Sequence, residues 1–279
     1  MKKGAHMILA CRNEARGVTA VQTIKEAVGE VQGAGQAEFM QVDVSDLSSV
    51  RLFAEGYRKA HDRLDILVNN AGIMAVGYQE SKDGFESQFA TNHLGHFALI
   101  SHLLDLLRTS EDARIVCITS LSHRNAKLTL NQLVWPQDKQ YDQQLVYANT
   151  KLYNLLFALE LDRRLKANGI TNIKVSASHP GFTVTNFLNS TLNASGVLFR
   201  AFFHTVSTIA QKPEMGILPI LYAATAPGVP GGELYGPKGF HNMWGYPTIE
   251  KPQNASVTED VARAIWTQSE QLAGIRFAI

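Results

Sequence analysis

The sequence predicts an α/β fold, a doubly wound parallel sheet with helices on both of its faces. Short runs that are apolar throughout alternate with longer segments whose apolar residues recur at helical spacing. Strands that are apolar at every position are buried on both faces, as in parallel sheets covered by helices. The composition agrees, because 45% of the 279 residues are hydrophobic and 18% are charged, so that a core can form.

The expected strands and helices alternate along most of the chain. The strands are His6–Ala10, Ala37–Val44, Leu64–Asn70, Ala113–Thr119 and Asn172–Ser178. The helices between them are Glu14–Val31, Leu47–Ala60 with Ser45 as its cap, Phe85–Leu107 and Leu145–Asn168. Since no linker or repeat interrupts this series, we expect residues 1–279 to form a single domain.

Charge and cysteine content exclude several classes of partner. The formal net charge is +1, so no basic excess indicates a nucleic-acid partner. The longest apolar stretch, Gly196–Ala224, is interrupted by charged residues and a proline, and we therefore expect no membrane span in this chain. The two cysteines, Cys11 and Cys117, are interpreted as buried free thiols. Free thiols are typical of a reducing compartment, and we expect a cytoplasmic protein.

One pair of residues indicates acid–base chemistry. Tyr147 and Lys151 are four residues apart in an expected helix, which places both on one face. An ammonium beside a phenol favours the phenolate, so we expect the pKa of Tyr147 to fall from about 10 toward neutrality. Such a tyrosine could exchange a proton with an alcohol or carbonyl oxygen. Taken alone, the same spacing is more typical of a pair of residues on an amphipathic helix surface.

Further motifs lie at the ends of the expected strands or on the helices that follow them. They are VNNAG at 68–72, TNHLGHF at 91–97, ITS at 118–120, YANTK at 147–151 and HPGFTVT at 179–185. In this order they resemble the short-chain dehydrogenase/reductase family, over nearly the whole chain. The stretches GAHMILACRN, NHLGHF and ARIVCITSLSHR are most similar to the branch with retinol dehydrogenases and WW-domain oxidoreductase-like proteins.

The resemblance implies a Rossmann-type fold and a catalytic role for four residues. Tyr147 would donate and accept the proton, and Lys151 would lower its pKa and bind the nicotinamide ribose. Ser120, preferred to Ser122 because it ends the strand in register, would hydrogen-bond the substrate oxygen. Asn92 would hold a water that links Lys151 to solvent. His93 and His96, which lack a convincing third ligand, are interpreted as packing residues, so no metal site is expected.

The same resemblance implies cofactor-binding residues in three regions of the chain. The stretch along the cofactor ribose would be Asn69, Asn70, Ala71 and Gly72. The nicotinamide side would be Pro180, Gly181, Thr183 and Thr185, with Thr183 in place of the usual valine. The adenine would contact Asp43, which is followed by Val44; Asp43 is also consistent with a turn or helix-capping aspartate.

The residues after the first expected strand favour NADP(H). NAD-dependent enzymes place an acid at this point to bond the ribose hydroxyls. Here the stretch Ala10–Asn13 contains no acid, and Arg12 offers a planar cationic fork that suits a 2′-phosphate. The alternative is that Arg12 is a solvated loop residue.

The family's TGxxxGxG turn, with the strand before it and the helix after it, is missing. That turn lets the backbone approach the pyrophosphate at a helix N-terminus. Its strand would be central, so we expect the edges of its two neighbours to be exposed. A strand–helix unit takes about 30 residues, so we expect Met1 to be a misplaced start with about 25–35 residues upstream. The alternative is a non-catalytic truncated fragment or scaffold that cannot bind nucleotide.

Residues 181–212 are expected to close over the site as a substrate lid. The segment is rich in Phe and Leu, which suits a small lipophilic alcohol, aldehyde or ketone. The alternative is an ordinary helix packed on the sheet. The leading hypothesis is thus an NADP(H)-dependent oxidoreductase that transfers a hydride between an alcohol and a carbonyl. By analogy with the family, the two long helices would pair in a homodimer.

Overall fold

A computed structural model describes residues 1, 3–29, 31, 33–128, 141–183 and 210–279 of the chain. Strands and helices alternate in its N-terminal part. They are β1 (Met7–Cys11), α1 (Glu14–Val28), β2 (Ala37–Gln41), α2 (Leu47–Ala60), β3 (Ile66–Asn69), α3 (Ser87–Phe89), α4 (Gly95–Arg108), β4 (Ala113–Ile118), α5 (Gln143–Ala167) and β5 (Ile173–Ser178). The C-terminal part adds α8 (Pro213–Gly216), α9 (Leu218–Thr225), β6 (Leu234–Pro237), β7 (Pro247–Glu250) and α10 (Glu259–Ala273).

The predicted α/β architecture is confirmed, with three differences in detail. The expected helix Phe85–Leu107 is divided into α3, a π-helical turn at Ala90–Leu94 and α4. The cap of α2 is Asp46 rather than Ser45, because the Asp46 carboxylate accepts hydrogen bonds from the backbone amides of Ser48 and Ser49. The sheet is not wholly parallel, since β7 pairs antiparallel with β6.

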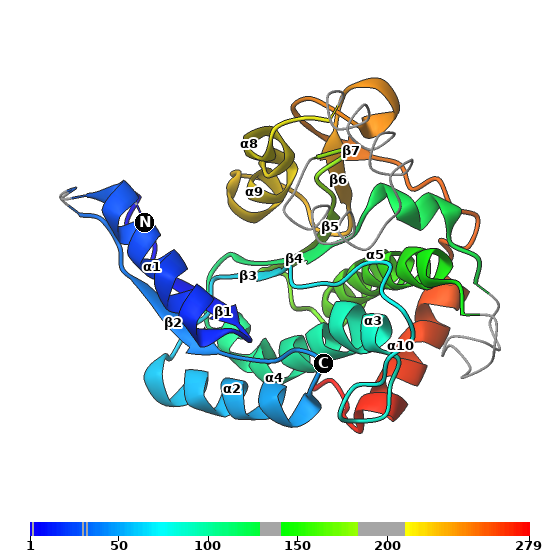
Figure 1. Ribbon diagram of the computed structural model, residues 1–279, viewed down its shortest axis with the longest axis horizontal. Helices are drawn as coiled ribbons and strands as arrows, with labels where there is room; N and C mark the ends of the chain where they lie inside the picture. The colour runs from blue at the N-terminus through cyan, green and yellow to red at the C-terminus, as the bar shows by residue number, and fades with distance from the viewer. Residues whose placement is uncertain (2, 30, 32, 129–140, 184–209) are drawn as a thin grey trace.

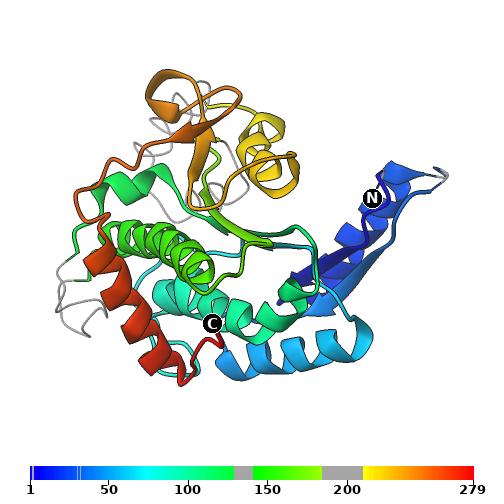
Figure 2. The same ribbon diagram turned by 180° about the vertical axis from the view of Figure 1, so that it is seen from behind.

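The sheet is interrupted between β1 and β3. One sheet is the parallel pair β1–β2, and the other has the order β3-β4-β5-β6-β7. Figures 1 and 2 show β1, β2 and α1 projecting away from the larger sheet. In the described part of the chain no strand pairs with the free edges of β1 and β3, and Met7, Ile66 and Val68 are more than one-third exposed there. This agrees with the predicted lack of a central strand.

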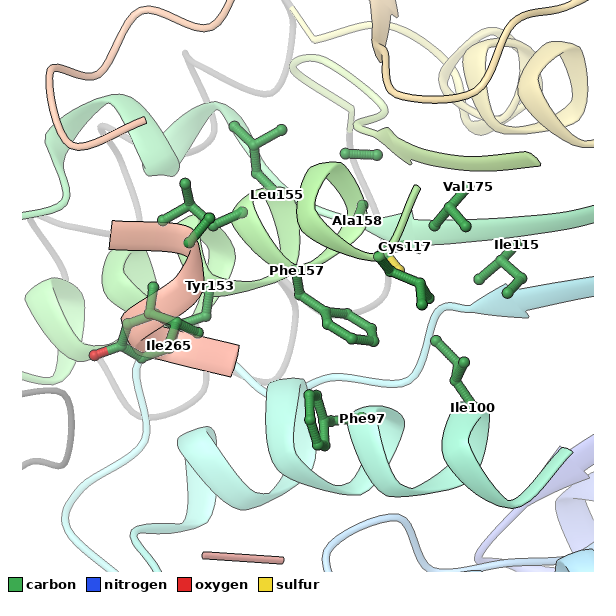
Figure 3. Packing of buried hydrophobic residues seen from close by; sticks show 14 of the residues in the cluster. Phe97, Ile100, Ile115, Cys117, Tyr153, Leu155, Phe157, Ala158, Val175 and Ile265 are labelled. Carbon is green, nitrogen blue, oxygen red and sulfur yellow. The ribbon is translucent and has the colours of Figure 1, made fainter. Parts of the chain in front are cut away.

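Helices cover both faces of the larger sheet. On one face, Ile115 and Cys117 of β4 and Val175 of β5 pack against side chains of α4 and α5, including Phe97 and Phe157 (Figure 3). On the other face, Val116 and Ile118 of β4 pack against α9. Alternate residues of β4 thus point to opposite faces, and all six are buried, as the uninterrupted apolar run predicts.

Helix α2 connects the β1–β2 pair to the rest of the molecule. Its buried side chains, Val50, Phe53 and Tyr57 among them, form one apolar cluster with Val42, Val44 and the outer side of α4. The start of α4 is very close to the chain after β2. A β-carbon added at Gly95 would lie 1.7 Å from the carbonyl oxygen of Val44, so only glycine fits at this contact.

Candidate active site

The C-terminal end of β4 brings the predicted catalytic side chains together. Ser120 follows β4 in an extended conformation, and α5 packs against β4 and β5 so that Tyr147 and Lys151 face this strand end. The Ser120 side chain lies near enough to Tyr147 to lower the pKa of its phenol. Ser120 Oγ also accepts a hydrogen bond of 3.2 Å from the backbone amide of Ser122, whose own hydroxyl is 3.3 Å away.

Lys151 is buried beside this pair. Its Nζ donates a hydrogen bond of 3.2 Å to the carbonyl oxygen of Ile118 and lies 5.7 Å from the centre of the Tyr147 ring. Burial disfavours the ammonium and lowers the pKa of Lys151 to about 8. The site therefore contains a cationic side chain that titrates near neutral pH.

The expected fall in the pKa of Tyr147 is wrong for this structure. Burial raises the pKa of Tyr147 above its usual value of 10, and the nearby Ser120 side chain offsets only part of that rise. The physical reason is desolvation, because Tyr147 is only 9% exposed and the Lys151 ammonium bonds a backbone carbonyl instead of the phenol oxygen.

Asn92 lies in the π-helical turn, and protein groups already bond its side-chain amide. Oδ1 accepts a hydrogen bond of 2.7 Å from the backbone amide of Ile73, while Nδ2 donates to the Ile73 carbonyl at 2.9 Å and to Thr150 Oγ1 at 3.0 Å. These bonds hold the chain after β3 against α5. The water relay through Asn92 stays a prediction, and π-turns of this kind are frequent at functional sites.

The segment after β3 has the open backbone that a nucleotide ribose needs. Asn70 and Ala71 are exposed, and the Ala71 carbonyl accepts a hydrogen bond of 2.8 Å from His96 Nε2. A β-carbon added at Gly72 would lie 3.1 Å from Asn92 Oδ1 and 3.5 Å from Lys151 Nζ. Glycine therefore keeps a cradle open beside the buried ammonium, and these residues fit the ribose of a nicotinamide cofactor.

The turn after β5 approaches the same strand end. Gly181 has a φ of +68°, and an added β-carbon would lie 2.4 Å from the carbonyl oxygen of Met243, so the turn requires glycine. Thr183 Oγ1 donates a hydrogen bond of 2.8 Å to the Pro180 carbonyl, which also accepts one of 2.6 Å from Gln211 Nε2. Thr185, and most of the expected lid 181–212, lie outside the described residues.

A buried ion network that the sequence did not reveal holds this turn. His179 Nε2 lies 2.7 Å from Glu250 Oε2, and Arg124 donates a hydrogen bond of 2.6 Å to the other oxygen of Glu250. Burial raises the pKa of Glu250, but the bonds from His179 and Arg124 lower it below its usual value. Glu250 ends the unexpected antiparallel strand β7, so sequence spacing contained no signal for this contact.

A second group of predicted residues surrounds a hollow of about 420 Å³ beyond the C-terminal ends of β1 and β2. Arg12 and Asp43 both line it, and Arg12 Nη1 lies 3.6 Å from Asp43 Oδ2. Asp43 also accepts hydrogen bonds from the Ser45 amide and hydroxyl, as the alternative of a turn aspartate implies. Val44 is buried below this turn. Lys82, which the sequence did not indicate, contributes a second cation.

Lys82 Nζ lies 2.6 Å from Asp46 Oδ2 at the rim of this hollow. The hydrogen bonds from Lys82 and Ser48 lower the pKa of Asp46 to about 2. The hollow therefore presents two exposed cations to a ligand, each near a carboxylate. In the described part of the chain no glycine-rich turn joins this hollow to the Gly72 cradle.

The chain is similar to known proteins over almost its whole length. The family description "short chain dehydrogenase" matches residues 1–132. Retinol dehydrogenase 14 of Mus musculus is 34% identical over 99% of this chain and 80% of that protein. The WW domain-containing oxidoreductase of Gallus gallus is 36% identical over 96% of this chain and 62% of that protein.

Solved structures agree with this relationship. An uncharacterized protein from Mycobacterium paratuberculosis superimposes with a TM-score of 0.72 at 34% identity, covering 98% of this chain and 85% of that chain. The L-sorbose reductase of Gluconobacter frateurii, solved with NADPH and L-sorbose, has a TM-score of 0.62 at 20% identity, covering 84% and 85%, which shows a common fold.

The chain belongs to the short-chain dehydrogenase/reductase family, an enzyme family that uses a nicotinamide cofactor. It is an oxidoreductase, and its relatives include retinol dehydrogenases. The described helices include none that is both long enough and apolar enough to span a membrane.

Proposed function

We propose that the protein interconverts an alcohol and a carbonyl compound with NADP(H), using Tyr147 as general acid and base. The observation that carries the proposal is the pairing of the Tyr147 and Ser120 side chains beside the buried Lys151 at the end of β4. A hydrogen-bond donor, a proton donor and a cation on one strand end are the groups that polarise and protonate a carbonyl oxygen.

The roles of the side chains follow from these contacts. The nicotinamide cofactor, when bound, supplies or accepts the hydride, and Lys151 with the Gly72 cradle would hold its ribose. Ser120 Oγ orients the substrate oxygen. Tyr147 donates its hydroxyl proton to that oxygen during reduction and takes it back during oxidation. The Lys151 ammonium lies close enough to stabilise the phenolate that remains.

The NADP(H) preference is proposed from the hollow that Arg12, Asp43 and Lys82 line. A guanidinium bonds a phosphate through two parallel hydrogen bonds, and the exposed Arg12 side chain is free to turn toward one. We expect Arg12→Ala to weaken NADPH binding at least about tenfold, the cost of about 1.4 kcal/mol, and to leave NADH binding unchanged. Equal losses for both nucleotides in fluorescence titrations would contradict the role of Arg12.

The proposed substrate is a small lipophilic alcohol, aldehyde or ketone. Support comes from the apolar segment 181–212 and from the name of the retinol dehydrogenase relatives. We further propose a single domain, with that segment as its lid, that acts in the cytoplasm as a homodimer. The two free thiols, Cys117 buried and Cys11 half-buried, support the reducing compartment.

A second candidate is a non-catalytic protein that does not bind nucleotide. The interrupted sheet favours it, because the strand that would lie between β1 and β3 would lead into the glycine-rich turn that binds the pyrophosphate. The two candidates differ in one measurable property, the binding of NADPH by the folded chain.

The test is a fluorescence titration of the folded 279-residue chain with NADPH, with NADH as the comparison. Saturable binding that is selective for NADPH supports the oxidoreductase, whereas a folded sample that binds neither nucleotide supports the second candidate. Turnover of an aliphatic aldehyde should disappear in Tyr147→Phe and persist in Tyr246→Phe, whose ring is 72% exposed. Full activity in Tyr147→Phe would contradict the acid–base role.

A further inference from the structure

Two histidines and a glutamate converge at one end of the β1–β2 pair. The hollow lined by Arg12, Asp43 and Lys82 lies at the other end. His6 precedes β1, Glu38 is the second residue of β2, and His61 follows the last residue of α2. His6 Nε2 lies 3.2 Å from Glu38 Oε1, and His61 Nε2 lies 3.0 Å from the same oxygen. One ligand atom from each residue lies within 4.8 Å of the other two.

The strand register explains why these side chains meet. Ile8 of β1 is paired with Glu38 of β2, so His6, two residues before Ile8, points to the same face as Ile8 and Glu38. Ile8 and Met40 pack in the apolar cluster with α2, which identifies this face as the one that α2 covers. His61, at the end of α2, therefore reaches the two strands from the helix side.

The contacts to Glu38 are at ion-pair distance but do not have hydrogen-bond geometry. Glu38 Oε1 and His61 Nε2 are both inaccessible to solvent, and neither has a hydrogen-bond partner among the described residues. Three polar atoms thus face a common point, and two of them are buried. A cation at that point would satisfy all three atoms, because imidazole nitrogen and carboxylate oxygen are both ligands of zinc.

The separations suit such a cation. Zinc–nitrogen and zinc–oxygen distances of about 2.0–2.1 Å in a tetrahedron place neighbouring ligand atoms about 3.3 Å apart. The observed separations of 3.0 and 3.2 Å are close to this value. The His6 and Glu38 side chains are 44% and 43% exposed, so a fourth position would be open to water.

We propose that His6, Glu38 and His61 bind one Zn²⁺ ion that fastens β1 and β2 to the end of α2. The site lies at the N-terminal ends of the strands, whereas Ser120, Tyr147 and Arg12 lie at their C-terminal ends. Its role is therefore to stabilise the β1–β2 pair, for which no strand among the described residues is a partner in the larger sheet. The proposal does not depend on the oxidoreductase activity.

Zinc binding to the chelator-treated chain, measured in competition with a chromophoric chelator, tests this proposal. The wild type should bind one Zn²⁺ per chain, and His61→Ala and Glu38→Gln should each bind it at least about tenfold more weakly. Even the loss of a group that only hydrogen-bonds a metal ligand lowers metal affinity by about tenfold or more. The matched control is His241→Asn, an exposed histidine at a positive φ that asparagine tolerates, and its binding should equal that of the wild type.

A second readout uses the thermal midpoint with and without Zn²⁺. The ion should raise the midpoint of the wild type and of His241→Asn and leave that of Glu38→Gln unchanged. If His61→Ala does not fold, His6→Asn provides the same test at a more exposed position. The proposal is overturned if the wild type binds no Zn²⁺. It is also overturned if the ligand variants bind Zn²⁺ as tightly as the wild type does, because the ion would then be adventitious and bound to other side chains.

Discussion

At the residue scale, burial determines how the catalytic side chains titrate. Tyr147 and Lys151 were predicted from their spacing to form a coupled pair, and the structure brings them to one strand end with Ser120. Spacing alone could not show how much water each group would lose. Desolvation raises the pKa of Tyr147 and lowers that of Lys151, because burial disfavours the charged form of each group.

The buried ammonium of Lys151 should destabilise the fold at neutral pH. The pKa of Lys151 is about 8 when folded and 10.5 as a free side chain, a difference equivalent to about 3 kcal/mol. The unfolded chain binds more protons between these two values, so stability should rise as the pH rises from about 8 to 10.5. Below pH 8 the cost is fully present.

We expect Lys151→Met to abolish turnover and yet to raise the free energy of unfolding at pH 7 by up to about 3 kcal/mol. The variant should also lose the rise in stability between pH 8 and 10.5. Urea denaturation at several pH values measures both effects, with the exposed Lys251→Met as control. A less stable Lys151→Met chain at pH 7 would show that the ammonium makes stabilising contacts that outweigh its desolvation.

At the element scale, helix positions follow from short backbone contacts as well as from apolar faces. Helix α4 begins at Gly95 against the chain that follows β2, and this contact sets how closely α4 approaches that segment. The sequence shows the motif that contains Gly95 but gives no reason for the glycine. The structure supplies the reason, because the carbonyl oxygen of Val44 lies directly against this position.

Gly95→Ala should therefore destabilise the protein by more than about 4 kcal/mol, since the added methyl group overlaps a backbone oxygen that cannot move away without displacing β2. Gly56→Ala in α2 is the matched control. Its β-carbon would meet only Met40 Cε at 3.8 Å, so alanine should leave stability unchanged or raise it by about 0.5–1 kcal/mol. Thermal denaturation of both variants measures the difference, and similar midpoints would contradict this account of the contact.

At the scale of the whole molecule, the interrupted sheet creates two regions of unequal stability. The β4–β5 centre is buried on both faces by α4, α5 and α9, whereas the β1–β2 pair packs against α1 and, through Ile8 and Met40, against the cluster of α2 and α4. Exposed Ile66 and Val68 on β3 show that the larger sheet ends in apolar surface at this interruption.

We expect hydrogen exchange to reveal this inequality directly. Amides of β1, β2 and α1 should exchange through a local opening, well before those of β4, β5 and α5, because fewer buried apolar contacts hold them. Mass spectrometry of peptides from both regions after a time course measures the effect. Equal protection in the two regions would mean that the chain opens only as one cooperative unit. Zinc should slow exchange in β1–β2 if the proposed ion site exists.

Sequence patterns were enough to predict the α/β class, the order of nearly all strands and helices up to β5, and the interruption of the sheet. Periodicity carries this information because each element must bury an apolar face. The motifs also indicated Ser120, Tyr147, Lys151 and Arg12. The direction of each pKa shift became visible only in the folded molecule, as did the Glu250 network with His179 and Arg124. The same is true of the cluster of His6, Glu38 and His61. These depend on burial and on contacts between residues distant in the chain, which no local pattern encodes.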